Sequence, residues 1–453
     1  MSHLDTIYAP ATLIGPAGLS VFRVSGSKAF DVLKALSRLD NTKINSHRAV
    51  LTKLYNPETK NKVDEALILP FKGPNSFTGE DVVEFHLHGG HAVANAFIKA
   101  LQTISGLRMA EPGEFTKRAF ENDRIDLTQA EAIADLIHAS TEAQHLLALD
   151  QLDGNLAKLY MDWALNLKNI LAYVEADIDF SDEDVPDELS SVMRPKIEDL
   201  ILNINKHLDD NNRGERLRDG LRIAIIGAPN AGKSSLINKL AKRDVAIVNE
   251  RAGTTRDIVE VALNINGFPV IIADTAGLRL TDDEIEEEGI SRAKKWAETA
   301  DFKIALFDSS KVPDVETVSM LDNETIILST KTDLSPALNI VNGTKAHAFS
   351  TNNEDDLSKL LSVLEEKAKT FFGFSINDNV SRETKNQTLI TRQRHRILVE
   401  ETKEHLSRSL SAPSVDMMAE DVRLAIRSLG KITGQIDVED LLDVIFNDFC
   451  IGK

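Results

Sequence analysis

The chain has 453 residues, of which 42% are hydrophobic and 27% are charged, and its formal net charge is −19. This length exceeds what one hydrophobic core fills, so we expect two or three domains. A surface this acidic should repel nucleic acid, so any contact with nucleic acid would need a local basic patch or a partner protein. The single cysteine excludes an intramolecular disulfide. No apolar stretch approaches about 18 residues and the N-terminus lacks the signal-peptide pattern, so we expect a cytoplasmic protein without a membrane span.

Residues 1–118 mix short strand patterns with helical ones. The stretches LSVFRVSG (19–26) and DVVEFHLHGG (81–90) predict strands that end in turns. The stretch HAVANAFIKALQTI (91–104) has apolar residues at helical spacing. This part of the chain therefore predicts an α+β domain.

The rest of the chain is helical at both ends and mixed in the middle. Residues 119–215 and 376–453 carry helical patterns, and residues 216–375 alternate strand and helix signals. Neither helical stretch buries its apolar face alone, so we infer that the two pack into one discontinuous all-α domain. The predicted fold is thus multidomain, with an α/β domain inserted into the helical one.

The inserted segment opens with the stretch LRIAIIGAPNAGKSSLINKL, which contains Gly227-x-x-x-x-Gly232-Lys233-Ser234. A buried-strand run feeds this loop and a helix leaves it, as a phosphate-binding loop requires. The glycines let backbone N–H groups turn toward phosphate oxygens. Lys233 supplies a compact positive charge for the β and γ phosphates, and the Ser234 hydroxyl is a hard oxygen ligand suited to Mg²⁺.

Two later stretches have the residues needed to sense a γ-phosphate. The polar loop RAGTTRD carries Thr254 and Thr255, which can close on the phosphate and give Mg²⁺ a second hydroxyl ligand. The buried strand in VIIADTAG delivers Asp274 to the outer coordination sphere of Mg²⁺ and Gly277 to the γ-phosphate. We therefore predict a nucleoside triphosphatase with a Ras-like P-loop domain.

The strand pattern IILSTKTD ends at Lys331 and Asp333 and indicates which base is bound. A carboxylate matches the N1–H and N2–H₂ donors of guanine, whereas the N1 acceptor of adenine leaves it unpaired, at a high cost. The pattern therefore favours GTP over ATP. Thr330 stands where the usual Asn-Lys-x-Asp motif has Asn. The stretch FST (349–351) fits the loop whose backbone reads the oxygen of the base.

Hydrolysis needs a group that positions water and a positive charge near the transferred phosphoryl group. Many GTPases have Gln after the Asp-x-x-Gly motif, but this chain has Leu278, which cannot orient water. The acidic run DDEIEEEG (282–289) supplies candidates in the adjacent segment.

Taken together, these features resemble the tRNA-modification GTPase family MnmE/TrmE. The resemblance rests on Thr-Thr-Arg-Asp after the P-loop, on Leu after Asp-Thr-Ala-Gly, on the inserted GTPase domain and on the terminal FCIGK. It extends over the whole chain through DTIYAPAT, RVSG, FTGEDVVEFHLHGG and EPGEFTKRAFENDRIDLTQAEAIADLI.

The resemblance implies a function and partners that spacing alone does not. Family members modify the wobble uridine (position 34) of certain tRNAs at C5, adding an aminomethyl or carboxymethylaminomethyl group together with an FAD-dependent partner. They use a 5-formyl- or methylene-tetrahydrofolate as the one-carbon donor. They form homodimers, and a heterotetramer with the partner. Their GTPase domains dimerise across the nucleotides, with K⁺ where an arginine finger would stand, so that GTP hydrolysis is stimulated by K⁺.

The resemblance also implies domain limits: an N-terminal folate-binding and dimerisation domain (1–118), a first helical part (119–215), the GTPase domain (216–375), and a second helical part with the CIGK tail (376–453). The residues implied in GTP binding are Asn230, Ala231, Gly232, Lys233, Ser234, Ser235, Asn249, Arg251, Gly253, Thr254, Thr255, Asp274, Thr275, Ala276, Gly277, Lys331, Asp333, Ser350 and Thr351.

The implied metal, folate and catalytic residues are smaller sets. Mg²⁺ is assigned to Ser234 and Thr255, and K⁺ to Asn230, Asn249, Arg251 and Thr254. The folate contacts are assigned to Arg23, Glu80, Arg124 and Lys453. The catalytic residues are Glu286, which orients water, and Lys233, with the Cys450 thiol as a further candidate.

Several alternatives stay open at this point. The tail Cys-Ile-Gly-Lys has the spacing of a prenylation box, but its Gly, its terminal Lys and its acidic surroundings disfavour lipidation. His86, His88 and His91 permit a metal site, and otherwise belong to a strand end. RQRHR (392–396) is the best local basic patch for tRNA, or else a solvated helix surface. The alternative function is a regulatory GTPase switch in ribosome assembly.

Overall fold

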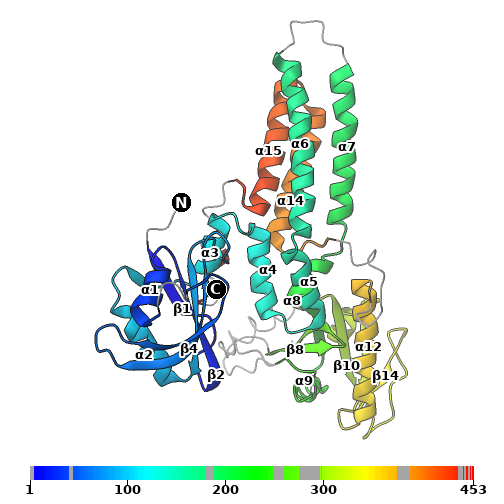
Figure 1. Cartoon of the computed structure of the whole chain (residues 1–453). Coiled ribbons are helices and arrows are strands. Elements are labelled where there is room, and N and C mark those ends of the chain that lie inside the picture. The colour runs from blue at the N-terminus through cyan, green and yellow to red at the C-terminus, as the bar shows by residue number, and fades with distance from the viewer. Residues whose placement is uncertain are drawn as a thin grey trace, which may run out of the picture. The chain divides into compact units, whose positions relative to one another are not determined.

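The structure is a computed structural model of the chain (Figure 1). It describes residues 5–39, 44–179, 188–243, 245–247, 259–274, 296, 298–374, 388–436, 442, 445–446, 449 and 451–452. Two compact units are present, Met1–Ala134 with Gln151–Lys168 and Ile426–Lys453, and Asp135–Asp150 with Asn169–Ala425.

The N-terminal part is a six-stranded sheet covered by helices. Its strands lie in the order β3 (Val50–Tyr55), β4 (Lys62–Phe71), β5 (Val82–Gly89), β2 (Ala17–Ser25), β1 (Thr6–Pro10) and β6 (Leu107–Met109). Neighbouring strands are antiparallel except β1 and β6, which are parallel. The predicted strands at 19–26 and 81–90 are confirmed as β2 and β5.

Helices α1 (Ala29–Leu36) and α2 (His91–Gln102) pack against this sheet. Phe97 of α2 meets Phe22 of β2 and Phe85 of β5, each with its ring centroid 5.1 Å away. Alternate residues of these strands supply the core because successive side chains point to opposite faces. The predicted helix at 91–104 and the α+β class are confirmed.

The helical stretches flank the inserted domain in sequence, and both form helices as predicted. The first stretch forms α3 (Glu114–Glu121), α4 (Leu127–His138), α5 (Glu142–Leu152), α6 (Asn155–Asp179), α7 (Glu188–Leu208) and α8 (Arg213–Asp219), and the second forms α14 (Gln393–Ser411) and α15 (Val415–Thr433). Helices α7 and α14 pack side by side (Figure 1), and Arg194 of α7 donates to the carbonyl of Leu410. Two helices far apart in sequence therefore pack together within the second unit.

The inserted domain is a six-stranded sheet between helices. The strand order is β14 (His347–Ala348), β11 (Ile326–Thr330), β10 (Phe302–Asp308), β7 (Leu221–Gly227), β9 (Phe268–Asp274) and β8 (Val259–Ile265). All neighbours are parallel except β8 and β9. Its described residues also form the helices α9 (Lys233–Ala241), α11 (Val315–Ser319) and α12 (Glu354–Phe372), and a short hairpin of β12 (Ile340–Val341) with β13 (Thr344–Lys345).

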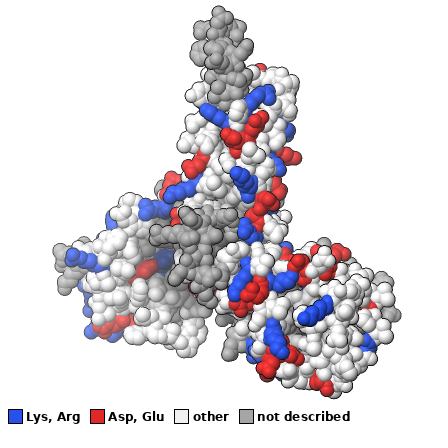
Figure 2. Space-filling model, turned by 90° about the vertical axis from the view of Figure 1, so that its right-hand side faces the viewer, with Lys and Arg blue, Asp and Glu red and all other residues white. Residues whose placement is uncertain are grey.

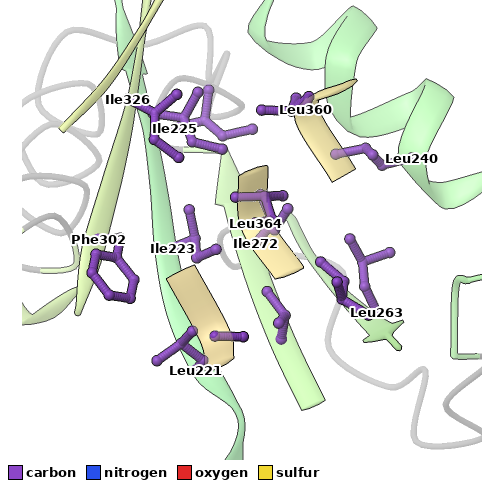
Figure 3. Close-up of a cluster of buried hydrophobic side chains, with 14 of the residues drawn as sticks. Leu221, Ile223, Ile225, Leu240, Leu263, Ile272, Phe302, Ile326, Leu360 and Leu364 are labelled. Carbon is purple, nitrogen blue, oxygen red and sulfur yellow. The ribbon is translucent and has the colours of Figure 1, made fainter. Parts of the chain in front are cut away.

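Strand β7 lies inside this sheet and is buried on both faces, as a parallel sheet requires. Leu221, Ile223 and Ile225 join one apolar cluster, in which Leu360 and Leu364 of α12 also lie (Figure 3). Ala224 and Ile226 join the cluster on the opposite face. The core thus fixes β7 firmly, and the loop that follows it is held at a defined place. Among the described residues, no helix combines the length and apolarity needed to cross a membrane.

Candidate functional site

The loop between β7 and α9 has the backbone conformation of a phosphate-binding loop. Gly227, Asn230 and Gly232 all have left-handed φ values, of 150°, 65° and 104°. A Cβ on Gly227 would come within 2.5 Å of the carbonyl oxygen of Leu306, so only glycine fits there. Lys233 begins α9 and is buried, and its ammonium donates to the carbonyls of Gly227 and, at 2.9 Å, Ala228.

These contacts place the lysine charge in the concavity of the loop. Ser234 and Ser235 follow on the first turn of α9 and are exposed, as Asn230 is in the loop. The helix N-terminus and the lysine together favour an anion at this place. Ala231, which also belongs to this loop, is buried.

Thr330, at the end of β11, ties the base motif to the phosphate loop. It is buried, and its hydroxyl lies 2.7 Å from the carbonyl oxygen of Ala231 and 3.2 Å from that of Phe307. A hydroxyl has one proton to donate, so the shorter contact to Ala231 is the stronger hydrogen bond. A threonine at this position therefore still joins the two motifs.

Asp333 is held by two neutral donors from the loop after β14. The Ser350 hydroxyl donates to one carboxylate oxygen at 3.0 Å, and the Asn352 amide donates to the other at 3.2 Å. These hydrogen bonds, led by that from Ser350, hold the pKa of Asp333 below its ordinary value. The Ser350 N–H in turn donates to Asp356 at 3.1 Å. The predicted base residues Asp333 and Ser350 are thus brought together, with Thr351 next in the chain.

Asn352 and Asp356 were not predicted from the sequence. Asn352 precedes α12 and Asp356 lies in the first turn of this helix, which Asn353 caps by accepting from the N–H of Asp355. That capping pattern predicts a helix start but not a contact with Asp333, because the contact depends on how β11 and β14 pair.

Lys331 is anchored by an ion pair. Its ammonium lies 2.6 Å from the carboxylate of Asp308, the last residue of β10. This hydrogen bond, with those from Ser310, lowers the pKa of Asp308 to about 2. Asp308 was also missed by the sequence reasoning.

The remaining predicted residues of the nucleotide, metal and tail sets have no described side chains. Asp274 ends β9 and pairs in register with Ile225 of β7, so its backbone lies beside the strand that feeds the phosphate loop. The residues that lie outside the described part of the chain are Asn249, Arg251, Gly253, Thr254, Thr255, Thr275, Ala276, Gly277, Glu286, Cys450 and Lys453.

In the N-terminal domain, the segment 77–80 contains Glu80 and touches the two other described residues of the predicted folate set, Arg23 and Arg124. The Arg23 guanidinium lies 5.4 Å from the ring of Phe77, and it donates to Glu84 at 2.9 and 3.1 Å. Arg124 is exposed, and its side-chain methylenes pack over Gly79: a Cβ added to Gly79 would lie 3.3 Å from the Arg124 Cγ.

Glu80, the third member of the set, is held by charge and hydrogen bonds. Its carboxylate accepts from the hydroxyl of Ser25 at 2.7 Å and from the guanidinium of Arg118 at 3.1 and 3.2 Å. Arg118 is fully buried and also pairs with Asp5 and Glu114. The burial of Arg118 could not be predicted from the sequence, because this residue lies on a helix that carries other charged residues.

The C-terminal tail lies against the N-terminal domain. Ile451 forms an antiparallel bridge with Pro112. Gly452 is buried, has a φ of 101°, and faces the carbonyl of Pro10 so closely that a Cβ has no room. The tail therefore reaches back to the N-terminal domain as expected, and Gly452 is the residue that lets it approach.

Gly452→Ala is expected to detach the tail, because alanine adds both a clash with Pro10 and a strained φ. We expect at least a tenfold loss of the tRNA modification that the family resemblance implies, with GTP hydrolysis within twofold of the original. Gly15→Ala is the matched control, since a Cβ at Gly15 meets nothing within 4 Å. Modification that is unchanged in Gly452→Ala would show that the seating of the tail is dispensable.

The alternative metal site at the histidines is not supported by the described residues. His88 pairs with Asp64 at 2.8 Å, and His86 lies 3.4 Å from Glu84. In the described ranges, no group of three or more His, Cys, Asp or Glu residues is arranged to hold a metal ion.

The segment RQRHR forms a structural joint. Arg392 pairs with Asp135 at 2.8 Å, and Arg396 pairs with Asp210 at 2.7 Å and Glu215 at 2.9 Å. His395 is fully buried. Two of its arginines are therefore engaged within the protein, and Figure 2 shows basic and acidic side chains interspersed over the described part of the face in view.

Comparisons with known proteins agree over the length of the chain. A family model described as the MnmE helical domain matches residues 127–450, and one described as the GTP-binding protein TrmE N-terminus matches residues 6–124. Proteins named tRNA modification GTPase MnmE are 45% identical in Rhodospirillum rubrum, 46% in Paramagnetospirillum magneticum and 44% in Rickettsia rickettsii. Each match covers 99% of this chain and 100% of the relative. The chain belongs to the MnmE family of tRNA modification GTPases.

Proposed function

We propose that this chain hydrolyses GTP in the service of tRNA modification. With an FAD-dependent partner, it installs an aminomethyl or carboxymethylaminomethyl group at C5 of the wobble uridine, position 34, of certain tRNAs. A tetrahydrofolate supplies the one-carbon unit. The observation that carries the GTP assignment is the joined site of phosphate loop and base motif, in which Thr330 links Ala231 to the strand that delivers Asp333. The relatives named tRNA modification GTPase support the tRNA part.

In the nucleotide step, Lys233 and the loop N–H groups hold the phosphates, and Asp333 accepts from the guanine N1–H and N2–H₂ donors. Ser350 and Asn352 hold the Asp333 carboxylate in place, so little side-chain entropy is lost when the base binds. The backbone of Ser350 and Thr351 reads the base oxygen. Glu286 is proposed to orient the water, because Leu278 lacks the group to do so.

The described residues fit the two metal ions of the proposal. Ser234, exposed at the start of α9, offers a hydroxyl oxygen for Mg²⁺, and Asn230 offers an exposed amide oxygen in a left-handed loop position. Both are hard oxygen donors next to the phosphate loop. Thr255 would complete the Mg²⁺ set, and Asn249, Arg251 and Thr254 would complete the K⁺ set. Bound K⁺ would neutralise the charge that develops on the phosphates.

The N-terminal domain likewise has groups that suit a folate. Arg124 is exposed and can pair with a glutamate carboxylate, as can Arg23 and Lys453. Glu80 is held by Ser25 and Arg118 through three contacts, which leaves acceptor capacity on its carboxylate for pterin N–H groups. A folate supplies the one-carbon unit, and the residues bind and orient it. The Cys450 thiol is proposed as a further reactive group.

The proposal includes the assembly and the place of action. The chain acts as a homodimer in the cytoplasm, and in a heterotetramer with the FAD-dependent partner. Because the net charge is −19 and Arg392 and Arg396 of the RQRHR segment are paired, contact with tRNA needs another basic surface, which the partner can provide.

K⁺ is expected to raise the kcat of GTP hydrolysis about tenfold over Na⁺ at equal ionic strength. The two ions carry the same charge, but the larger and more weakly hydrated K⁺ would occupy the proposed oxygen site and so place its charge near the transferred phosphoryl group. Steady-state phosphate release in the two salts measures this. Asn230→Ala should remove the difference, and Asn266→Ala, which changes another exposed, left-handed asparagine, should preserve it. Equal rates in both salts would refute the K⁺ assignment and leave the GTPase assignment standing.

A further inference from the structure

Asp308 lies between the two halves of the nucleotide site without belonging to either motif. Strand β10 runs between β7, which feeds the phosphate loop, and β11, which delivers the base motif. Leu306 pairs in register with Gly227, and Asp308 pairs with Thr330. The carboxyl ends of these parallel strands meet at one edge of the sheet, where ligands of such sheets bind. Asp308 is therefore placed beside the base motif by the strand order.

The Asp308 carboxylate is buried and its acceptors are occupied. Its side chain is 6% exposed, against 37% for that of Lys331. One oxygen accepts from the N–H and hydroxyl of Ser310, at 3.0 and 2.7 Å, and the other accepts from the Lys331 ammonium at 2.6 Å. Burial of a carboxylate is costly unless it is paired and hydrogen-bonded, so this residue depends on Lys331 more than Lys331 depends on it.

The backbone of Lys331 is held by the same strand end. Its φ is 59°, a left-handed value that is uncommon for a residue with a side chain. Its carbonyl accepts from the N–H groups of Leu334 at 2.9 Å and Ser335 at 3.2 Å. The Ser309 hydroxyl, which has one proton to donate, lies 3.3 Å from this carbonyl oxygen and equally far from that of Ser335. The lysine is thus held at both ends, at its carbonyl by the turn that follows and at its ammonium by Asp308.

We infer that Asp308 is a positioning residue for guanine binding, which acts by holding the Lys331 side chain as a fixed apolar arm beside Asp333. The inference rests on the proposed GTP site. The methylene stem between the two fixed ends offers a flat apolar surface to a purine ring. Because the stem is already ordered, base binding avoids most of the rotamer entropy that a free lysine would lose. Asp308 itself touches neither base nor phosphate.

A positioning role for Asp308 predicts effects on nucleotide binding that a purely structural role does not predict. The effect of losing Asp308 should be equal for GDP and GTP, because it acts on the base, and kcat at saturating GTP should stay unchanged while KM rises. The effect should also require Lys331. In a double-mutant cycle, Asp308→Asn should therefore have little further effect once Lys331 is replaced by Met.

The experiment titrates the full-length chain with fluorescent GDP and GTP analogues. Asp308→Asn is expected to weaken the binding of both analogues by about tenfold, and Lys331→Met is expected to weaken it by a similar factor. The double variant should bind no more than about twofold more weakly than Lys331→Met alone. Lys331→Arg should retain most of the affinity. Asp322→Asn is the matched control, since it breaks the other Lys–Asp pair of β10, with Lys303 at 2.8 Å, at the far end of the strand.

Different results would contradict the positioning role of Asp308 and the proposed GTP site. Binding that is unchanged in Asp308→Asn, or a tenfold loss that persists in the Lys331→Met background, would overturn the positioning role. Failure of the unsubstituted chain to bind either analogue would overturn the GTP site itself. If Asp308→Asn does not fold, Lys331→Met carries the test, because it removes the ammonium that Asp308 holds; unchanged affinity there would overturn the role equally.

Discussion

Lys233→Ala is expected to lower kcat/KM for GTP hydrolysis by about 10³-fold, or about 4 kcal/mol of transition-state stabilisation. The lysine ammonium is buried in the phosphate loop, where it contacts the carbonyls of Gly227 and Ala228. A charge fixed in a site of low dielectric stabilises developing phosphoryl charge far more than the same charge in water. Alanine also keeps the helix propensity of α9, so the fold should be retained.

The measurement is steady-state GTP hydrolysis with a thermal melt of each variant. Lys239→Ala is the control, because it lies in the same helix with a side chain that is 44% exposed and 3.9 Å from Glu354. A surface pair of this kind contributes little. Activity of Lys233→Ala within about tenfold of the original would contradict the assignment of this loop to the transferred phosphate.

Asp333→Asn is expected to weaken GTP binding by about 100-fold or more and to create binding of XTP. The carboxylate offers two acceptors to the N1–H and N2–H₂ donors of guanine, whereas an amide offers one acceptor and one donor. Xanthine has a carbonyl in place of the guanine amino group, so the amide fits it. A site whose polar groups match one base rejects the mismatched one strongly.

The comparison measures the affinities of GTP and XTP for both proteins, with Asp355→Asn, an exposed neighbour on α12, as the control. The pKa of Asp333 is lowered, so its carboxylate stays ionised at pH values at which an ordinary aspartate has begun to take up a proton. Its contribution is therefore complete at neutral pH and is lost only as pH falls through the lowered pKa. No gain of XTP binding would show that Asp333 does not contact the base.

The strand, loop and helix around Lys233 could be predicted from sequence because they are consecutive in the chain. The apolar run of β7, the glycines of the loop and the helical spacing after Lys233 are all local signals. The N-terminal strands and α2 could be predicted for the same reason.

The contacts that complete the site are not local, and the sequence does not contain them in readable form. Asp308 meets Lys331 because β10 and β11 pair in parallel, and Ser350 meets Asp333 across the next strand. The arginines of RQRHR looked like a basic surface because their partners, such as Asp135, lie far away in the chain. Long-range pairing therefore decides which charges are free, and a count of charges does not.

The central claim is that this GTPase serves wobble-uridine modification, and mass spectrometry of tRNA nucleosides tests it most directly. Total tRNA would be compared from a strain that has the protein, one that lacks it, and deletion strains that carry the original chain, Lys233→Ala or Lys239→Ala. We expect the C5-modified uridine to vanish in the deletion strain and to return with the original chain and Lys239→Ala, but not with Lys233→Ala. An unchanged nucleoside profile in the deletion strain, with precursors of ribosomal subunits accumulating instead, would contradict the claim and support a switch in ribosome assembly.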